Sequence, residues 1–193
     1  MITISPYTEL AYIAWAILII IWVAEAFGNK KTVTVSHKGE QVVVFVLISI
    51  GFGLMFNQHE LPWALTTYVM HPQVQSSLLG DILALSGVAF AIWARFALGK
   101  NWSGAVVTIK KDHKLVESGP YAYVRHPIYA GFLTAAVGTA FTIGTFASFL
   151  AVVFLLIACT IRIRREEEMM IAHFPDEYPA YMTRTRALIP YLF

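Results

Sequence analysis

Long apolar runs separated by short polar segments dominate the pattern of this chain. A helix needs about 20 mostly apolar residues to cross the hydrocarbon core of a membrane, with a lower limit near 17. The runs at residues 10–27, 41–56 and 78–98 meet or approach this length. The pattern therefore predicts an all-α, polytopic membrane protein, and the length of 193 residues predicts a single domain, 1–193.

The next apolar run is too long for one crossing. Residues 129–163 are almost uncharged. As one helix rising about 1.5 Å per residue they would measure about 52 Å, against a hydrocarbon core of about 30 Å. The segment 144–148, Gly-Thr-Phe-Ala-Ser, supplies a break near the middle. We therefore expect a tight helical hairpin with spans at 129–143 and 146–163, which brings the total to five transmembrane helices.

The basic residues test this five-span topology. With five spans, all 14 Lys and Arg residues fall on one side of the membrane, in the loops 28–40 and 99–128, near the end of the third span and from 162 onward. Because Lys and Arg are in excess on the cytoplasmic side of membrane proteins, this places the N-terminus outside and the C-terminus inside. Chemistry that uses soluble cofactors is then expected on the cytoplasmic face.

Composition removes several classes of function. Hydrophobic residues make up 58% of the chain and charged residues 13%, about half the charged share of a soluble domain, which excludes disordered and coiled-coil proteins. A single cysteine, Cys159, excludes an internal disulfide and a zinc cluster built on thiolates. The net charge of +2 is too small to indicate nucleic acid as a partner. No metal site is expected, because the spacing of His113, His126 and His173 matches no ligand pattern.

The loop 99–128 gathers polar and aromatic residues at the start of the fourth span. Residues 106–116 carry β-branched patches around a polar centre, which favours a small hairpin or an extended segment. Residues 118–120 predict a turn, and Pro127 suits the first turn of a helix. The residues expected near this helix start are His113, Tyr121, Tyr123, Arg125, His126 and Tyr129. Together they suit an anionic group or a flat heterocycle, whereas each alone is typical of an interfacial anchor.

The tail begins with a run of charges, Arg-Arg-Glu-Glu-Glu at 164–168. If the fifth helix continues, Arg164 and Glu168 lie one turn apart and can pair. Three adjacent carboxylates repel one another, so one of them is expected to face a cationic ligand instead. Glu25, Asp81 and Arg95 lie in or at the ends of spans, where pairing or snorkelling to the interface is the expected arrangement.

Residues 119–131 read Gly-Pro-Tyr-Ala-Tyr-Val-Arg-His-Pro-Ile-Tyr-Ala-Gly. This stretch resembles the isoprenylcysteine carboxyl methyltransferase family, whose hallmark is Arg-His-Pro, a variable residue, Tyr, another variable residue and Gly. Upstream, residues 113–116 are similar to the family's His-x-Leu-Val element. The tail elements similar to its C-terminal pattern are Glu166-Glu167, His173-Phe174, Tyr178, Tyr181 and Ile189-Pro190. The resemblance covers about residues 100–190, and the short N-terminal half is similar to that of prokaryotic members.

The resemblance implies a methyltransferase of a prokaryotic plasma membrane that uses S-adenosylmethionine and releases S-adenosylhomocysteine. The cofactor contacts that it implies are His113, Lys114, Leu115, Val116, Gly119, Tyr121, His126, Pro127, Ile128, Tyr129 and Glu167. Glu167 would face the ammonium group of the cofactor, and the aromatic and apolar side chains would hold the adenosine. In eukaryotic members, an arginine implicated in substrate binding lies four residues before this glutamate. Here that position is Ile163, and its neighbours Arg162 and Arg164 are the candidates for substrate binding.

The implied reaction explains why no catalytic base is evident. A sulfonium methyl group is already activated and a carboxylate is already ionised near neutral pH, so an in-line transfer requires only alignment and exclusion of water. We therefore expect O-methylation of a lipophilic or lipidated carboxylate such as an isoprenylcysteine, with no catalytic residue assigned. The alternatives are a phospholipid-type N-methyltransferase, an NADPH-dependent membrane sterol or enone reductase, which carries a similar Arg-His-Pro-x-Tyr stretch, and a non-enzymatic scaffold or channel.

Overall fold

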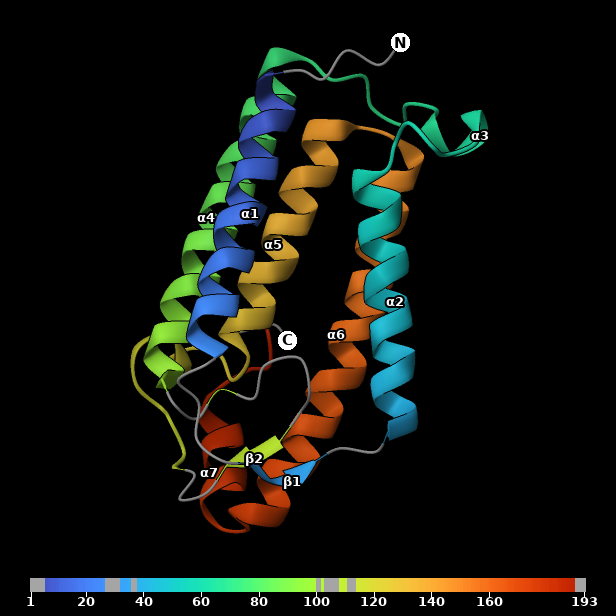
Figure 1. The fold of residues 1–193 in the computed structure, drawn as a ribbon. Helices are drawn as coiled ribbons and strands as arrows, with labels where there is room; N and C mark the ends of the chain where they lie inside the picture. Colours follow the sequence, from blue (N-terminus) through green and yellow to red (C-terminus); the bar gives the residue numbers. More distant parts are fainter. Residues whose placement is uncertain are drawn as a thin grey trace.

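The computed structural model describes residues 6–26, 32–35, 38–99, 102, 108–110 and 114–189. Its long helices form an elongated bundle with short elements at both ends (Figure 1). The helical elements are α1 (Pro6–Ala26), α2 (Lys38–Phe56), α3 (Trp63–Thr66), α4 (Val74–Leu98), η2 (Gly119–Ala122), α5 (Pro127–Ile143), α6 (Phe146–His173) and α7 (Glu177–Arg184). The strands are β1 (Thr32–Val35) and β2 (Thr108–Lys110). We call the end of the bundle that carries α7 the α7 end, and the opposite end the Gly144 end.

The long helices have the character of an integral membrane protein. Three of those described, α2, α4 and α6, are long and apolar enough to cross a membrane. Two shorter apolar helices lie at residues 8–24 and 127–143, within α1 and α5. The predicted helical membrane architecture is thus confirmed, whereas the five crossings and their orientation stay a prediction. α6 also continues past 163, the predicted end of the last span, to His173.

Glycines bring α4 and α5 into contact backbone to backbone. A Cβ atom added to Gly87 of α4 would lie 2.5 Å from the nitrogen of Ala135, and one added to Gly131 of α5 would lie 2.6 Å from the nitrogen of Ala91. A Cβ atom on Gly138 would be equally close to the backbone of α4. Small residues let helices in a membrane approach closely. We call this contact between the two helices the α4–α5 seam. It sets the position of α5, which begins within the Arg-His-Pro stretch at residues 125–127.

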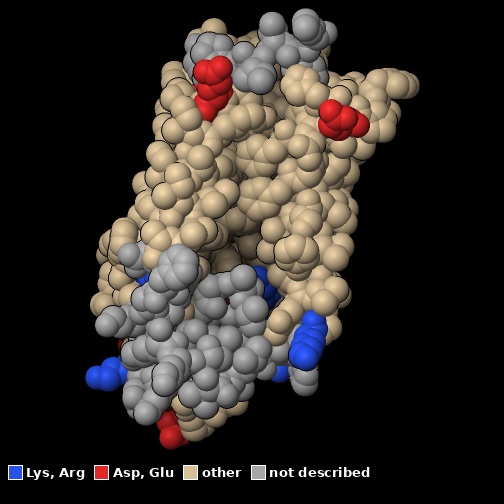
Figure 2. All heavy atoms as spheres, viewed as in Figure 1, with Lys and Arg blue, Asp and Glu red and all other residues tan. Residues whose placement is uncertain are grey.

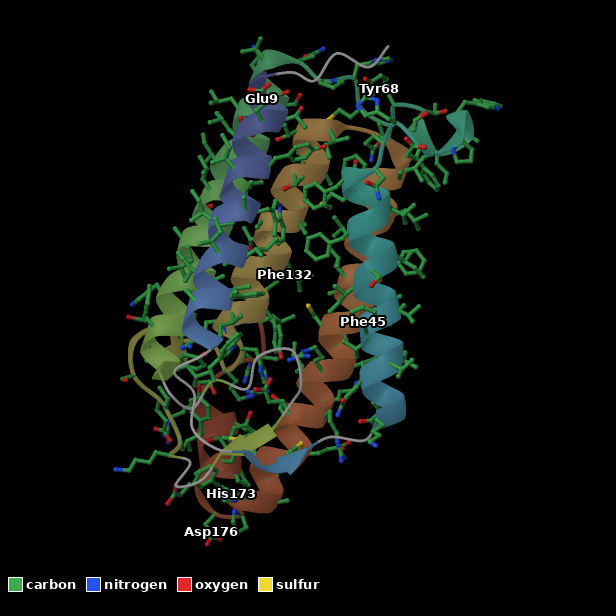
Figure 3. All side chains as sticks on the ribbon, viewed as in Figure 1. Glu9, Phe45, Tyr68, Phe132, His173 and Asp176 are labelled. Carbon is green, nitrogen blue, oxygen red and sulfur yellow. The ribbon has the colours of Figure 1, made fainter. Side chains whose placement is uncertain are left out.

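Aromatic rings join α1, α2 and α5 inside the bundle. Phe132 of α5 is 7% exposed, and its ring centroid lies 5.2 Å from that of Trp15 in α1. The ring of Phe52 in α2 lies 6.0 Å from Phe132 on another side, and Trp22 stacks on it at 6.3 Å. Figure 3 shows Phe132 inside the bundle, whereas Phe45 of α2 points away from it. Such ring pairs contribute about 0.5–1.5 kcal/mol each beyond the area that they bury.

The predicted break near Gly144 is confirmed. Gly144 has a φ of 78° and its nitrogen donates to the carbonyl of Ala140, which makes it a left-handed cap that ends α5. The Thr145 hydroxyl accepts a hydrogen bond from the Ser148 nitrogen and caps the start of α6. A Cβ atom at Gly144 would also collide with the carbonyl of Met70. The resulting hairpin returns the end of α6 to the α7 end, where α5 begins (Figure 1).

A two-stranded antiparallel ribbon of β1 and β2 lies at the α7 end, so the fold is not purely helical (Figure 1). The extended conformation expected within 106–116 is confirmed at β2. The partner of β2, however, is not another part of that segment but β1 from the first loop, with Thr32 opposite Lys110. Hydrophobic alternation in one segment identifies a strand but carries no information about a partner far away in the sequence.

The charged side chains do not all lie where the sequence suggests. On the face shown in Figure 2, the Lys and Arg atoms that are drawn lie toward the α7 end. Asp81 and Arg95 are only 3% and 1% exposed, so of the two expected arrangements they do not snorkel but have partners: Asp81 accepts from the Thr142 hydroxyl, and Arg95 donates to the Gly99 carbonyl. The side chain of Glu25 lies outside the described residues. The expected partner of Glu168 is Arg164, one turn earlier. Glu168 instead pairs with Arg165, whose NH1 atom lies 2.9 Å from its Oε2 atom.

Candidate functional site

Polar side chains from α5 and α6 face one another at the α7 end. His126 is the N-cap residue of α5, Pro127 is its first residue and Tyr129 lies in its first turn. Because α5 and α6 form an antiparallel hairpin, these residues lie beside Glu166 and Glu167 of α6, about forty positions further along the chain. Both glutamates belong to the polar last part of α6, beyond the segment 146–163 that we expect in the membrane.

The side chains of Arg125 and His126 hold the carboxylate of Glu167. Its Oε1 atom accepts a hydrogen bond from Nε of Arg125 at 2.7 Å and lies 3.2 Å from Nε2 of His126. The side chain of His126 is 5% exposed and that of Glu167 is 17% exposed. Burial by itself would raise the pKa of the Glu167 carboxyl, but these hydrogen bonds outweigh it and hold the pKa below its usual value. Glu167 is therefore a fixed negative charge at neutral pH.

Glu166 forms a second branch of the network. The Tyr129 hydroxyl donates to its Oε2 atom at 3.1 Å, and Nδ1 of His126 lies 3.7 Å from the same atom. Arg162, one turn earlier on α6, donates from Nε to the Tyr129 hydroxyl oxygen at 3.0 Å, and its guanidinium lies over the Tyr129 ring. A positive charge is therefore positioned where the polar network meets the apolar part of α6.

The C-terminal segment closes this network from the side. The nitrogens of Arg125 and His126 donate to the carbonyls of Arg186 and Ala187, at 2.8 and 3.0 Å. The Arg125 guanidinium also donates to the carbonyl of Thr185 at 2.7 Å. Arg125 thus joins three parts of the chain: the loop before α5, Glu167 of α6 and the segment after α7.

Three tyrosines of η2 and α7 remain neutral here. Burial, with the nearby carboxylates Glu166 and Glu167, raises the pKa of Tyr178 far above its usual value. Burial likewise raises the pKa of Tyr121 and of Tyr181. The Tyr181 hydroxyl donates to the Tyr121 carbonyl at 2.5 Å and so fixes α7 against η2. Neutral phenols can donate a hydrogen bond, as Tyr181 does, and present flat rings, but they do not act as bases.

An apolar wall stands beside the network. Tyr121 and Ile128 are buried in a small cluster with Ala94 of α4, against which Trp102 and Val116 pack. The ring of Trp22 from α1 lies 6.1 Å from that of Trp102. A flat aromatic or heterocyclic group fits such a wall, whereas a charged group fits the network beside it.

The structure brings together most of the residues expected at the site. Tyr121, His126, Pro127, Ile128 and Tyr129 are buried or half-buried around the start of α5, and Val116, Leu115 and Gly119 lead into it. Lys114 is exposed at the edge of the described loop, and His113 lies outside the described residues. Of the two candidate substrate arginines, Arg162 joins the network, whereas Arg164 is exposed. Among the described residues, no three His, Cys, Asp or Glu side chains gather as a metal site would require.

Sequence reasoning missed several members of the network. It counted Arg125 in the loop cluster but gave it no role. The charge pattern left open which of the three glutamates is engaged, the family resemblance named Glu167, and neither gave Glu166 a role. The structure gives Arg125 a central position and engages Glu166 as well as Glu167. The close spacing of Arg125, His126 and Tyr129 at a helix start was the signal available, because all three then fall near whatever element packs against that start.

Residues 80–172 match the model of the isoprenylcysteine carboxyl methyltransferase family. A protein-S-isoprenylcysteine O-methyltransferase of Schizosaccharomyces pombe is 33% identical over 147 residues, which cover 72% of this chain and 58% of that protein. The protein of the same name in Saccharomyces cerevisiae is 34% identical over 118 residues, 60% of this chain and 49% of its own length. The cobalt-zinc-cadmium resistance protein CzcN of Cupriavidus metallidurans is 31% identical over 153 residues, 78% and 61% respectively. The chain thus spans about half to three fifths of the length of these curated relatives.

Proposed function

We propose that this chain, which belongs to the isoprenylcysteine carboxyl methyltransferase family, transfers a methyl group from S-adenosylmethionine to a carboxylate on a lipophilic acceptor. The observation that carries the proposal is the junction at the α7 end. There the fixed carboxylate of Glu167 and the cation of Arg162 lie within one polar network, directly next to apolar helices. Relatives named protein-S-isoprenylcysteine O-methyltransferase support an isoprenylcysteine-like acceptor.

The residues at this junction fit S-adenosylmethionine. When bound, this cofactor supplies a methyl group that its sulfonium has already activated. Glu167 provides a negative charge for the ammonium group of the cofactor, and the wall of Tyr121 and Ile128 provides a flat apolar surface for its adenosine. The N-terminus of α5 favours a negatively charged group by its dipole, which suits the carboxylate of the same cofactor.

The residues of the chain itself would align the cofactor with the acceptor and exclude water, and none of them would need to transfer a proton. A carboxylate acceptor is ionised at neutral pH, so no base is needed to activate it. Among the described residues of the site, Tyr121 and Tyr178 are neutral phenols, which also cannot act as bases. The segment after α7 lies against Arg125 of the network and would help to exclude water. Excluding water matters because water would otherwise solvate the acceptor carboxylate and the sulfonium of the cofactor.

Arg162 is the better candidate for holding the acceptor carboxylate. It is half-buried and fixed by Tyr129, whereas Arg164 is exposed. Replacing Arg162 by glutamine is expected to raise the KM for a prenylated cysteine acceptor by about tenfold to a hundredfold, the factor for losing a hydrogen bond to a charged group. The kcat and the KM for the cofactor should change much less. Steady-state kinetics of R162Q beside R164Q checks this, and the assignment is wrong if only R164Q raises the acceptor KM.

The acceptor would reach this junction from within the membrane. Figure 2 shows that the face between α1 and α2 is hollowed just above the α7 end. We propose that the chain crosses the membrane five times with the α7 end in the cytoplasm of a prokaryote. The soluble cofactor then arrives from the cytoplasm, and a lipophilic acceptor arrives sideways between the helices. The one-sided distribution of Lys and Arg supports this orientation.

Binding measured by titration calorimetry tests the proposal directly. The detergent-purified protein is expected to bind S-adenosylhomocysteine, the product of the cofactor, and not NADPH. Binding of NADPH alone would favour a sterol or enone reductase, and binding of neither by protein with a cooperative thermal transition would favour a non-enzymatic role. If the cofactor binds, a methylation assay with a prenylated cysteine beside phosphatidylethanolamine separates O-methylation from N-methylation.

A further inference from the structure

Arg95 is a buried guanidinium that the proposed reaction does not use. It lies in the last turn of α4, is 1% exposed and is the largest of the fully buried side chains that the structure describes. An arginine near the end of an apolar helix ordinarily extends its charge toward water at the membrane surface. Here the charge turns inward instead, and burying it is costly unless its contacts are favourable. Its contacts therefore indicate what it holds.

The first contacts of Arg95 fix the chain just after α4. Its NH1 atom donates to the carbonyl of Gly99 at 2.9 Å, while the Gly99 nitrogen donates to the backbone carbonyl of Arg95. Gly99 is the C-cap residue of α4 and has a φ of 56°, a backbone conformation that glycine adopts readily. The Trp102 nitrogen then donates to the Gly99 carbonyl at 3.3 Å. The guanidinium and Trp102 thus share one anchor.

Arg95 also holds the side chain of Trp102. Its guanidinium carbon lies 4.4 Å from the centroid of the indole ring, well within the range of a cation–π contact. Arginine suits this position because its planar, weakly hydrated group stacks on a ring, which the ammonium of lysine does less well. The indole ring of Trp102 thus has two neighbours, the Arg95 guanidinium and the ring of Trp22, whose centroid lies 6.1 Å away.

This arrangement belongs to the apolar wall of the site. Trp102 packs in the same cluster as Tyr121 and Ile128. The charge of Arg95 reaches Tyr121 as well, since it partly offsets the rise in the pKa of this phenol that burial causes. The Arg95 side chain thus connects Gly99, directly after α4, to two rings of the wall that the proposed function assigns to the adenosine.

We propose that Arg95 is a positioning residue that orders Trp102 as one wall of the cofactor site. The inference rests on the proposed function, because it assigns a role within the same site. Arg95 would not contact the reacting atoms. It would set the position of a flat surface against which the adenosine packs, so its loss should weaken cofactor binding and leave the acceptor and the transfer step nearly unchanged.

Three variants, Arg95→Lys, Trp102→Leu and Trp102→Phe, test this role. Replacing Arg95 by lysine keeps a cation and removes the planar stack, and replacing Trp102 by leucine removes the ring. Trp102→Leu is expected to raise the dissociation constant of S-adenosylhomocysteine and the KM for S-adenosylmethionine by about thirtyfold, the factor that corresponds to the ~2 kcal/mol of a desolvated cation–π contact. R95K, which keeps a cation, is expected to raise both by about fivefold to thirtyfold. The kcat and the acceptor KM should stay within about threefold of wild type. Trp102→Phe restores a ring and should recover most of the binding.

The matched control is Arg165→Lys, because Arg165 forms ion pairs with Glu40 and Glu168 that a lysine can also make. It should bind the cofactor product as wild type does. If wild type itself fails to bind, the proposed function falls and not this inference alone. If wild type binds and R95K binds equally well, the inference is wrong. It is also wrong if the kcat and the affinities for cofactor and acceptor all decrease together with the melting temperature. If R95K does not fold, the comparison of W102L with W102F decides.

Discussion

Glu167→Gln is expected to raise the dissociation constant of S-adenosylhomocysteine about a hundredfold or more, and to remove methyl transfer accordingly. Glu167 is mostly buried and ionised, and it accepts from Arg125 with His126 beside the same oxygen. Glutamine keeps the size of the side chain but removes the charge that would face the ammonium of the cofactor. Breaking a mostly buried ion pair costs about 3 kcal/mol or more, which sets the expected factor. Calorimetry with purified protein measures it.

Glu168→Gln is the matched control for this substitution. Glu168 is the next residue on α6, but its side chain is 65% exposed and pairs with Arg165. An exposed ion pair contributes about 1 kcal/mol or less, so this variant should bind S-adenosylhomocysteine as wild type does. Equally weakened binding of S-adenosylhomocysteine in E167Q and E168Q would show that binding depends on the total negative charge of this part of α6 and not on the position of Glu167. Unchanged binding in E167Q with a wild-type melting curve would remove Glu167 from the cofactor site.

Elements with a local signal could be predicted from the sequence. The end of α5 at Gly144 followed from the length of an uncharged run and from a glycine near its middle, and the left-handed conformation of that glycine explains why. The start of α5 followed from Pro127 in the same way. Both depend on residues within one turn of the boundary, which the sequence displays directly.

Pairings between distant segments could not be predicted in this way. β2 pairs with β1, and the nitrogens of Arg125 and His126 pair with the segment after α7. A backbone nitrogen is the same in every residue apart from proline, so no side-chain pattern marks its partner. The same reason left the role of Arg125 open, because its contacts with Glu167 and Thr185 exist only after α5, α6 and the tail have come together.

The burial of Arg95 shows a different limit of sequence reasoning. A charged residue near the end of an apolar helix can extend outward or fold inward, and helical periodicity alone does not distinguish the two. What decides here lies after the helix, since the Gly99 carbonyl accepts from both Arg95 and the Trp102 nitrogen, and the Trp102 ring lies against the guanidinium. An aromatic residue shortly after an arginine and a glycine is a weak signal, and it becomes informative only once the turn is known.

The seam between α4 and α5 determines how the site is assembled, because Gly131 lies one turn after Pro127, at which α5 begins. Gly131→Ala would place a Cβ atom 2.6 Å from both the Ala91 nitrogen and the Gly87 carbonyl oxygen, which belong to a helix backbone and cannot move aside alone. The two helices must separate. Overpacking of this kind costs about 1–3 kcal/mol, so the melting temperature in detergent should fall by roughly 2–10 °C.

Gly53→Ala is the control, because a Cβ atom at Gly53 of α2 meets nothing within 4 Å. Alanine is the better helix former by roughly 0.5–1 kcal/mol, so this variant should melt at the wild-type temperature or slightly above it. In G131A, the displaced start of α5 should also weaken the binding of S-adenosylhomocysteine, since His126 and Tyr129 move with it. A G131A protein with unchanged melting and unchanged binding would show that the seam tolerates separation and does not set the position of the site.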